Sequence, residues 1–268
     1  MSRQASGLIF ILFLTVVTAC SGTGDRVLTF SHGAIIRGDT TVQEIALVFT
    51  GDEFGDGLEF ISGMLKDEDI RASFFLTGKF YRNREFEPWI RLLAADGNYL
   101  GSHSDNHLLY CDWVKRDSLL VTRKEFLDDL EASHDELQKF GINKEQALWY
   151  LPPYEWYNDS IATWTREYGL QLINFTPGTR SNADYTIPEM GTGYVDSRTI
   201  CNSVVSYESR QETGLNGFIL LVHAGTDPRR TDKFYFLLPE LVRELKARGY
   251  SFVRIDDLLN GTMINKDS

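Results

Sequence analysis

The chain has 268 residues, of which 43% are hydrophobic, and its 38 acidic and 27 basic residues give a formal charge of −11. Such an acidic chain is a poor match for nucleic acid, so we expect no nucleic-acid partner. The length and the apolar content suit one large domain with a sizeable core.

The first twenty residues have the layout of an export signal. Arg3 gives a positive start, an apolar run covers Leu8–Val17, and Cys20 follows small residues. The run is too short to span a bilayer, and a cysteine in this place is typical of a bacterial lipobox. We predict a signal peptide over residues 1–19, a lipoprotein of the bacterial cell envelope, and membrane contact only through a lipid on Cys20. An ordinary cleaved signal is the alternative.

Residues 20–43 are typical of a tether and N-terminal extension, with one strand-like piece around Val27–Phe30. From residue 44 short apolar runs alternate with helical periodicity, most clearly over Lys124–Phe140 and Glu240–Lys246. The alternation predicts an α/β fold in one domain over residues 44–260, a barrel of about seven parallel strands, with an open doubly wound sheet as the alternative. The predicted strands are Ile45–Phe49, Ala72–Leu76, Asn98–Leu100, Ala147–Leu151, Leu170–Phe175, Phe218–Val222 and Ser251–Ile255.

Two features lie outside this pattern. Asn182–Ser197 is polar and patternless, which is typical of a functional or capping loop. Cys111 and Cys201 are too few for a disulfide scaffold or a zinc cluster, and the sequence leaves open whether they pair.

Polar side chains follow several of the predicted strands. Active sites of β/α barrels form where the carboxyl ends of the strands meet the loops. The polar residues at these ends are Asp52, Glu53, His103, His107, Tyr154, Glu155 and His223.

His103 and His107 are four residues apart, so on a helical turn both imidazoles would face the same way. With the Asp52 carboxylate they would hold a divalent metal, most simply zinc, and leave a position open for water or a carbonyl oxygen. This set predicts metal-assisted hydrolysis, although two histidines at this spacing also arise by chance.

The segment from Gly101 to His107 resembles the His-Ser/Thr-x-x-His motif of polysaccharide deacetylases, the NodB homology domain of carbohydrate esterase family 4. Other family motifs have counterparts in the same order: an acidic turn after the first strand, Pro153-Tyr154, and Leu221-Val222-His223. The resemblance covers about residues 44–256.

The resemblance implies a distorted (β/α) barrel that removes acetyl groups from acetylated sugars, by cleaving amide C–N bonds or acetyl esters. It also implies a metal, usually zinc, on Asp52, His103 and His107. His223 would be the general acid, the backbone amide of Tyr154 would bind the oxyanion, and a separate aspartate would be the general base.

The first motif departs from the family pattern, which is Thr-Phe-Asp-Asp-Gly. Counting back from Ala72 places Asp52 at the metal ligand and Gly51 at the general base. A shift of one residue would instead make Asp52 the base and Glu53 the ligand.

Further departures affect the partners of the base and the acid. Leu151 stands where the family has an arginine that orients the base, and the fourth motif's Asp-Trp pair has no clear counterpart. Asp184 or Asp227 could take the part of that aspartate. Glu53 and Glu155 are candidate replacement bases, and each could equally be a structural or solvent-facing glutamate.

Aromatic rings and arginines near the predicted site suggest contacts with a sugar. Trp113, Trp156 and Tyr157 are candidates to line a sugar cleft, although aromatic residues are also core material. Arg229 and Arg230 could bind an acidic sugar or brace their loop through Asp232, and bracing is the expectation.

Three hypotheses follow from these features. The first is an envelope-anchored, metal-dependent deacetylase of an acetylated polysaccharide or oligosaccharide. The second is a deacetylase-like barrel that has lost its base and only binds glycans. The third is a metal hydrolase with a re-sited base such as Glu53 or Glu155.

Overall fold

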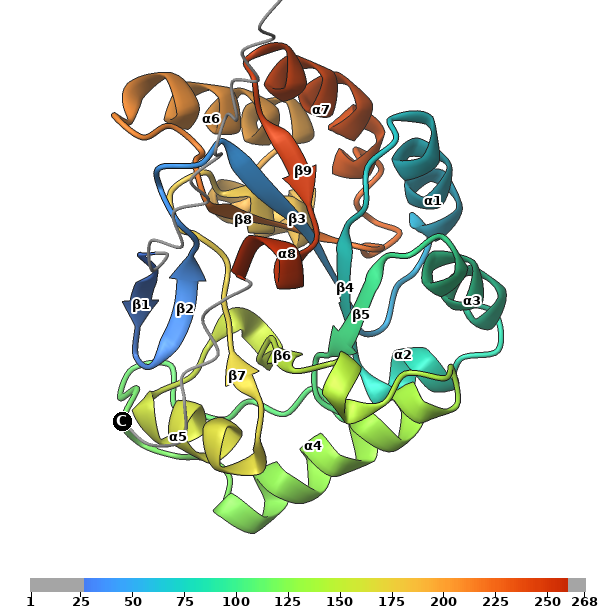
Figure 1. Cartoon of the computed structure of the whole chain (residues 1–268), viewed down its shortest axis with the longest axis vertical. Helices are drawn as coiled ribbons and strands as arrows, with labels where there is room; N and C mark the ends of the chain where they lie inside the picture. The colour runs from blue at the N-terminus through green and yellow to red at the C-terminus, as the bar shows by residue number, and fades with distance from the viewer. Residues whose placement is uncertain (1–26, 260–268) are drawn as a thin grey trace, which may run out of the picture.

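The computed structural model describes residues 27–259 (Figure 1). The predicted signal peptide and the predicted lipid-bearing Cys20 therefore lie outside the described residues. Within the described range, no helix has both the length and the apolar character needed to cross a membrane.

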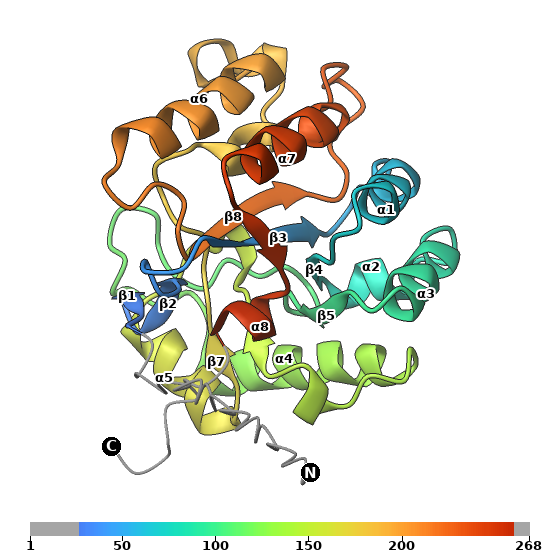
Figure 2. The ribbon, with the colours of Figure 1, turned by 45° about the horizontal axis from the view of Figure 1, so that its top comes forward.

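Seven parallel strands form one curled sheet, which confirms the predicted distorted barrel (Figures 1 and 2). Their order is β7-β6-β5-β4-β3-β8, and β9 also pairs with β3. All seven predicted strands are present, with small changes in their ends. Their bounds are β3 Glu44–Gly51, β4 Ser73–Leu76, β5 Tyr99–Ser102, β6 Trp149–Tyr150, β7 Gln171–Leu172, β8 Phe218–His223 and β9 Ser251–Val253.

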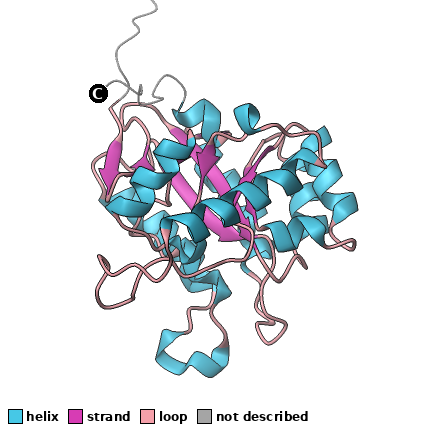
Figure 3. Ribbon diagram, turned by 90° about the horizontal axis from the view of Figure 1, so that it is seen from below, coloured by secondary structure: helices cyan, strands magenta, loops and turns pink. Residues whose placement is uncertain are grey.

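Helices surround the strands, because parallel neighbours need a crossover between them (Figures 1 and 3). Local sequence fixes several helix ends. Thr122 and Glu125 form a reciprocal capping box before α4, and α5 ends at Gly169, whose φ is 96°. The helices are α1 Leu58–Asp67, α2 Gly78–Arg82, α3 Glu87–Ala95, α4 Arg123–Gln138, α5 Asp159–Tyr168, α6 Ser197–Arg210, α7 Leu238–Ala247 and α8 Ile255–Leu259. Short 3₁₀ turns are η1 Lys144–Gln146, η2 Pro153–Glu155, η3 Ser181–Tyr185, η4 Pro188–Gly193 and η5 Phe234–Leu237.

An N-terminal hairpin, β1 Thr29–Ser31 and β2 Ala34–Arg37, fills the gap between the two edges of the curled sheet. Ile35 is fully buried and forms a parallel bridge with Ile173. The Asn174 amide donates to the Ile35 carbonyl at 2.8 Å. This part of the predicted N-terminal extension is therefore a wall of the barrel and not only a tether.

The pleat of β3 divides the core into two layers. Leu47 and Phe49 pack on the helix side of the sheet, whereas Ala46 and Val48 face the barrel interior. Helix α8 fills the centre of the ring of strands and contributes Leu258 to the interior cluster (Figure 1).

The structure answers whether the two cysteines pair, which the sequence left open. Cys111 and Cys201 are both buried and both free, so no disulfide links them.

Phe74→Ala should destabilise the fold by about 3–5 kcal/mol, because Phe74 is fully buried and stacks on Phe49 with ring centroids 4.9 Å apart. Denaturant unfolding followed by circular dichroism measures the change. The matched control is Phe236→Ala, where the ring is 55% exposed and a loss of about 1 kcal/mol or less is expected. Equal losses in the two variants would contradict the assigned core.

Candidate active site

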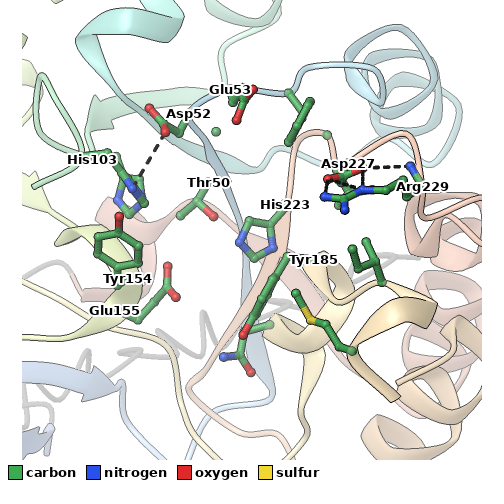
Figure 4. Close-up of a pocket in the computed structure, with 18 of the residues that line it drawn as sticks. Thr50, Asp52, Glu53, His103, Tyr154, Glu155, Tyr185, His223, Asp227 and Arg229 are labelled. Carbon is green, nitrogen blue, oxygen red and sulfur yellow. Dashed lines mark hydrogen bonds and ion pairs between the residues drawn. The ribbon is translucent and has the colours of Figure 1, made fainter. Parts of the chain in front are cut away.

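A cavity of about 600 Å³ opens at the carboxyl ends of the strands (Figure 4). Residues from β3, the loop after β5, η2, η3 and β8 meet there, although they are far apart in the sequence. Eight of the predicted site residues line it: Asp52, Glu53, His103, His107, Trp113, Tyr154, Glu155 and His223.

The segment from His103 to His107 is not a helical turn, contrary to expectation. Ser104 and His107 have φ values of 73° and 56°, which are incompatible with a right-handed helix. Asp129 on α4 holds the loop by accepting hydrogen bonds from the Asp105 and Asn106 backbone amides. The loop still brings the two imidazole rings close together, with their centroids 5.1 Å apart.

Both imidazoles of this loop are held neutral. Burial lowers the pKa of His103 well below its ordinary value, and the neighbouring His107 adds to the effect. Burial also lowers the pKa of His107 to about 4, although the nearby Asp52 opposes the shift. His103 Nδ1 donates to the Leu151 carbonyl at 2.8 Å, which leaves Nε2 with a free lone pair.

These side chains fit a divalent cation in their chemistry. Two neutral imidazoles and one carboxylate are a common donor set for zinc, and the fixed His103 tautomer is typical of a metal-binding histidine. Asp52 Oδ2 lies 3.8 Å from His107 Nδ1. Within residues 27–259, however, no three His, Cys, Asp or Glu side chains are already gathered at coordinating positions.

The pKa of His223 is shifted in the opposite direction from those of His103 and His107. Its Nδ1 donates to Asp184 Oδ1 at 2.6 Å, and its backbone amide donates to Asp184 Oδ2 at 2.9 Å. Burial opposes protonation of His223, but Asp184, with a smaller contribution from Glu155, raises its pKa above the ordinary value. Of the two aspartates that the sequence left open, Asp184 is the one that pairs with His223.

Glu155 lies across the cavity from His223 on a strained turn. Tyr154 and Glu155 are consecutive residues with φ values of 58° and 52°, a costly conformation for residues other than glycine. Burial raises the pKa of Glu155 to about 7, the charge of His223 opposes the shift, and Asp184 adds to it. Glu53, by contrast, is exposed at the rim.

The end of β3 places its residues differently from the sequence prediction. Gly51 follows the helix-side face of Leu47 and Phe49, and a Cβ there would lie 2.8 Å from the Phe80 ring. It therefore has no room for a base side chain. Thr50 continues the interior face and points into the cavity (Figure 4).

Two of the predicted sugar-contacting aromatics do not line the cavity. Tyr157 is buried and its hydroxyl donates to the Ser31 carbonyl, so it is a core residue. Trp156 packs behind Trp113 and under the Arg116 guanidinium, which lies 3.6 Å from the ring centroid. The direction of the chain after η2 turns both away from the mouth, whereas Trp113 is 54% exposed at the rim.

The polar loop predicted over Asn182–Ser197 forms another wall of the cavity. Arg230 is fully buried and donates to the Thr186 and Val195 carbonyls at 2.6 and 3.0 Å. Arg230 Nη2 lies 3.7 Å from Asp232 Oδ2. Arg230 therefore braces the loop as expected, but mainly through its hydrogen bonds to backbone carbonyls. Arg229 pairs with Asp227 on the surface.

Several cavity residues escaped the sequence analysis: Thr50, Asn182, Tyr185, Ile187 and Met190. Most belong to the loop that the missing periodicity had marked as functional. Tyr185 follows Asp184 directly, and its ring lies 5.7 Å from that of His223.

Asp184→Asn should lower the pKa of His223, because burial then acts with less opposing charge. In the wild type the folded pKa is raised, so the pair stabilises the fold below the ordinary histidine pKa and the gain is lost as pH rises through the raised value. Titration of the His223 imidazole by NMR measures the shift. Asp227→Asn is the matched control and should leave it in place; a shift in the control alone would refute the pairing.

Comparison with known proteins agrees with this architecture. The peptidoglycan-N-acetylmuramic acid deacetylase PdaA of Bacillus subtilis is 22% identical over 85% of this chain and 76% of its own length. A solved structure of B. subtilis PdaA, described as a family 4 carbohydrate esterase, superposes with a TM-score of 0.64 at 20% identity, covering 85% of each chain.

A second structural neighbour is described as a CE4 family pseudoenzyme from Bacillus anthracis. It has a TM-score of 0.66 at 18% identity and covers 86% of this chain and 70% of its own. A mutant of that protein is described as having restored enzymatic activity. The polysaccharide deacetylase family model matches residues 37–173, half of the chain. The chain belongs to the polysaccharide deacetylase family.

Proposed function

We propose that the chain is a metal-dependent hydrolase that removes acetyl groups from an acetylated glycan of the bacterial cell envelope. One observation carries the proposal: a buried Asp184–His223 pair faces two neutral histidines and Asp52 across one cavity. Such hydrolysis needs a proton donor with a raised pKa and, opposite it, neutral side chains that can bind a metal.

Asp52, His103 and His107 would hold the metal. A bound divalent cation, zinc by the nature of these donors, would polarise the acetyl carbonyl and make water more acidic. His103 could bind the metal through Nε2 without a change of tautomer, because its Nδ1 already donates to the Leu151 carbonyl.

The remaining groups supply the proton transfers. Glu155 as carboxylate takes a proton from the attacking water, whose oxygen forms a bond to the acetyl carbon. The Tyr154 backbone amide is the expected donor to the oxyanion. His223 gives its proton to the leaving nitrogen or oxygen as the old bond breaks, so acetic acid and the free amine or hydroxyl result. Glu155 is thus a re-sited base. We favour it over Glu53 because the charge of His223 affects the pKa of Glu155 and because Glu155 is less exposed.

An extended glycan suits the shape of the site. Trp113, Tyr154 and Tyr185 are each about half exposed at the mouth and offer faces for stacking on sugars. A second cavity of about 630 Å³ shares Glu53, Phe54 and Thr226 with the first. The two adjoining cavities together offer more room than one sugar unit needs. The relatives named for peptidoglycan deacetylation favour an envelope glycan. The proposed lipid anchor on Cys20 would hold the protein beside it.

A second candidate function is glycan binding without turnover. Gly51 has no space for the usual base, Leu151 replaces the arginine, and a structural neighbour is described as a pseudoenzyme. Glycan binding with no acetate release, from metal-loaded protein, would favour it over the first proposal.

His107→Asn should abolish acetate release and weaken binding of zinc, measured by calorimetry as well as by activity. His32→Asn is a matched control, since His32 lies outside the cavity and both residues have positive φ, which asparagine tolerates. Chelation should remove wild-type activity and added zinc should restore it. Undiminished acetate release by His107→Asn or by chelated protein would contradict a metal-dependent reaction.

Glu155→Gln should lower kcat by about 10²-fold or more, the usual range for a lost general base. Because the pKa of Glu155 is raised to about 7, the wild-type rate should rise as pH increases through about 7. It should fall again as His223 loses its proton above its own raised pKa. The variant should lose the rising limb, and the Glu53→Gln control should keep it. The reverse pattern would assign the base to Glu53.

A further inference from the structure

The Thr50 side chain is a buried polar group with no partner of its own. Thr50 is 1% exposed, its hydroxyl has no hydrogen-bond partner within residues 27–259, and it lines the active-site cavity. A buried hydroxyl without a partner costs free energy, so a fold that keeps one usually uses it.

Other buried threonines of this protein do find partners. Thr165 donates to the Ile161 carbonyl at 2.8 Å, and Thr176 donates to the Ile36 carbonyl. Ser62 and Ser181 are also unpaired, but neither lines the cavity. Among the buried hydroxyls of residues 27–259, Thr50 is therefore the unpaired one that belongs to a residue lining the cavity.

The position of this hydroxyl is fixed. Thr50 pairs with Phe75 on β4 and with His223 on β8, and its carbonyl accepts from the Ala224 amide at 2.7 Å. A β-branched side chain has little χ1 freedom in a strand held on both edges. Figure 4 shows Thr50 between Asp52, Glu155 and His223.

We propose that Thr50 is a positioning residue that orients the attacking water. The inference rests on the proposed deacetylation. One O–H of the water donates to Glu155 and the other to Thr50 Oγ1, so an oxygen lone pair faces the acetyl carbon. The C–O bond forms as the proton passes to Glu155, and the C–N or C–O bond to the sugar breaks as His223 supplies its proton. Thr50 itself neither gains nor loses a proton.

The test compares Thr50→Val, which has nearly the same shape without the hydroxyl, with Thr50→Ser, which keeps it. Purified variants are assayed for acetate release from an N-acetylglucosamine tetramer with zinc present, and their melting temperatures are measured. Thr50→Val should lose about 10²-fold in kcat, the scale of a misplaced reactant, with KM little changed. Its melting temperature should equal or exceed that of the wild type, because no hydrogen bond is lost. Thr50→Ser should keep most of the activity.

Thr165→Val is the control for a structural threonine: it should melt lower and retain kcat, since it loses the bond to Ile161 far from the site. Full activity of Thr50→Val would overturn the inference while leaving the proposed deacetylation standing. A lower melting temperature in Thr50→Val, as in the control, would overturn it by revealing a structural bond. If the wild type releases no acetate at all, the proposed function fails and the inference falls with it.

Discussion

The hydrogen bonding of β3 along both of its edges is the constraint on which the site depends. One edge pairs with β8 over Ile45–Thr50, and the other pairs with β9 and then β4. The register is therefore fixed, and a shift by one residue would turn every side chain to the opposite face. With the register fixed, Thr50 must face the cavity and Gly51 must face Phe80 in the helix layer. The chemistry available at the mouth of the barrel follows from this alternation.

Histidines of the same cavity have pKa values shifted in opposite directions because their surroundings differ. Burial lowers the pKa of both His103 and His107, which favours the neutral form that the proposed metal binding needs. Burial also lowers the pKa of His223, but the buried Asp184 outweighs this effect and raises the pKa above its ordinary value. Asp52 also lies beside His107, but its effect on the pKa of His107 is smaller than that of burial. The balance between burial and a carboxylate partner thus separates the proposed proton donor from the proposed metal ligands. Arg230 maintains the separation indirectly, because it secures the loop that carries Asp184.

Much of the fold was readable from the sequence, because each sheet strand is a short apolar run and neighbouring runs pair through helices. The second strand of the N-terminal hairpin, Ala34–Arg37, was not, since its place depends on a bridge from Ile35 to Ile173, far away in the chain. The positive φ of His107 was also hidden, because the hydrogen bonds that hold its loop come from Asp129 on another element. Asp184 could be named but not placed, because it contacts His223, which is 39 positions away in the sequence. Spacing predicts which residues gather at strand ends, but long-range contacts decide which of them touch.

The charge balance of the cavity argues for a moved base and not merely a lost one. Leu151 is fully buried, so an arginine at that position would need a carboxylate partner in the core. Gly51, where the family has its general base, cannot supply that partner, so the loss of the arginine and the loss of the usual base belong together. Backbone strain of this kind persists where it serves catalysis or the binding of a ligand, so the turn at Tyr154 and Glu155 marks this wall of the cavity as functional. Glu155 is the carboxylate of this turn, coupled to His223 and titrating near neutrality. The cost of this turn to the fold is therefore consistent with the re-sited base that we propose, because a purely structural turn would be built more cheaply with glycine.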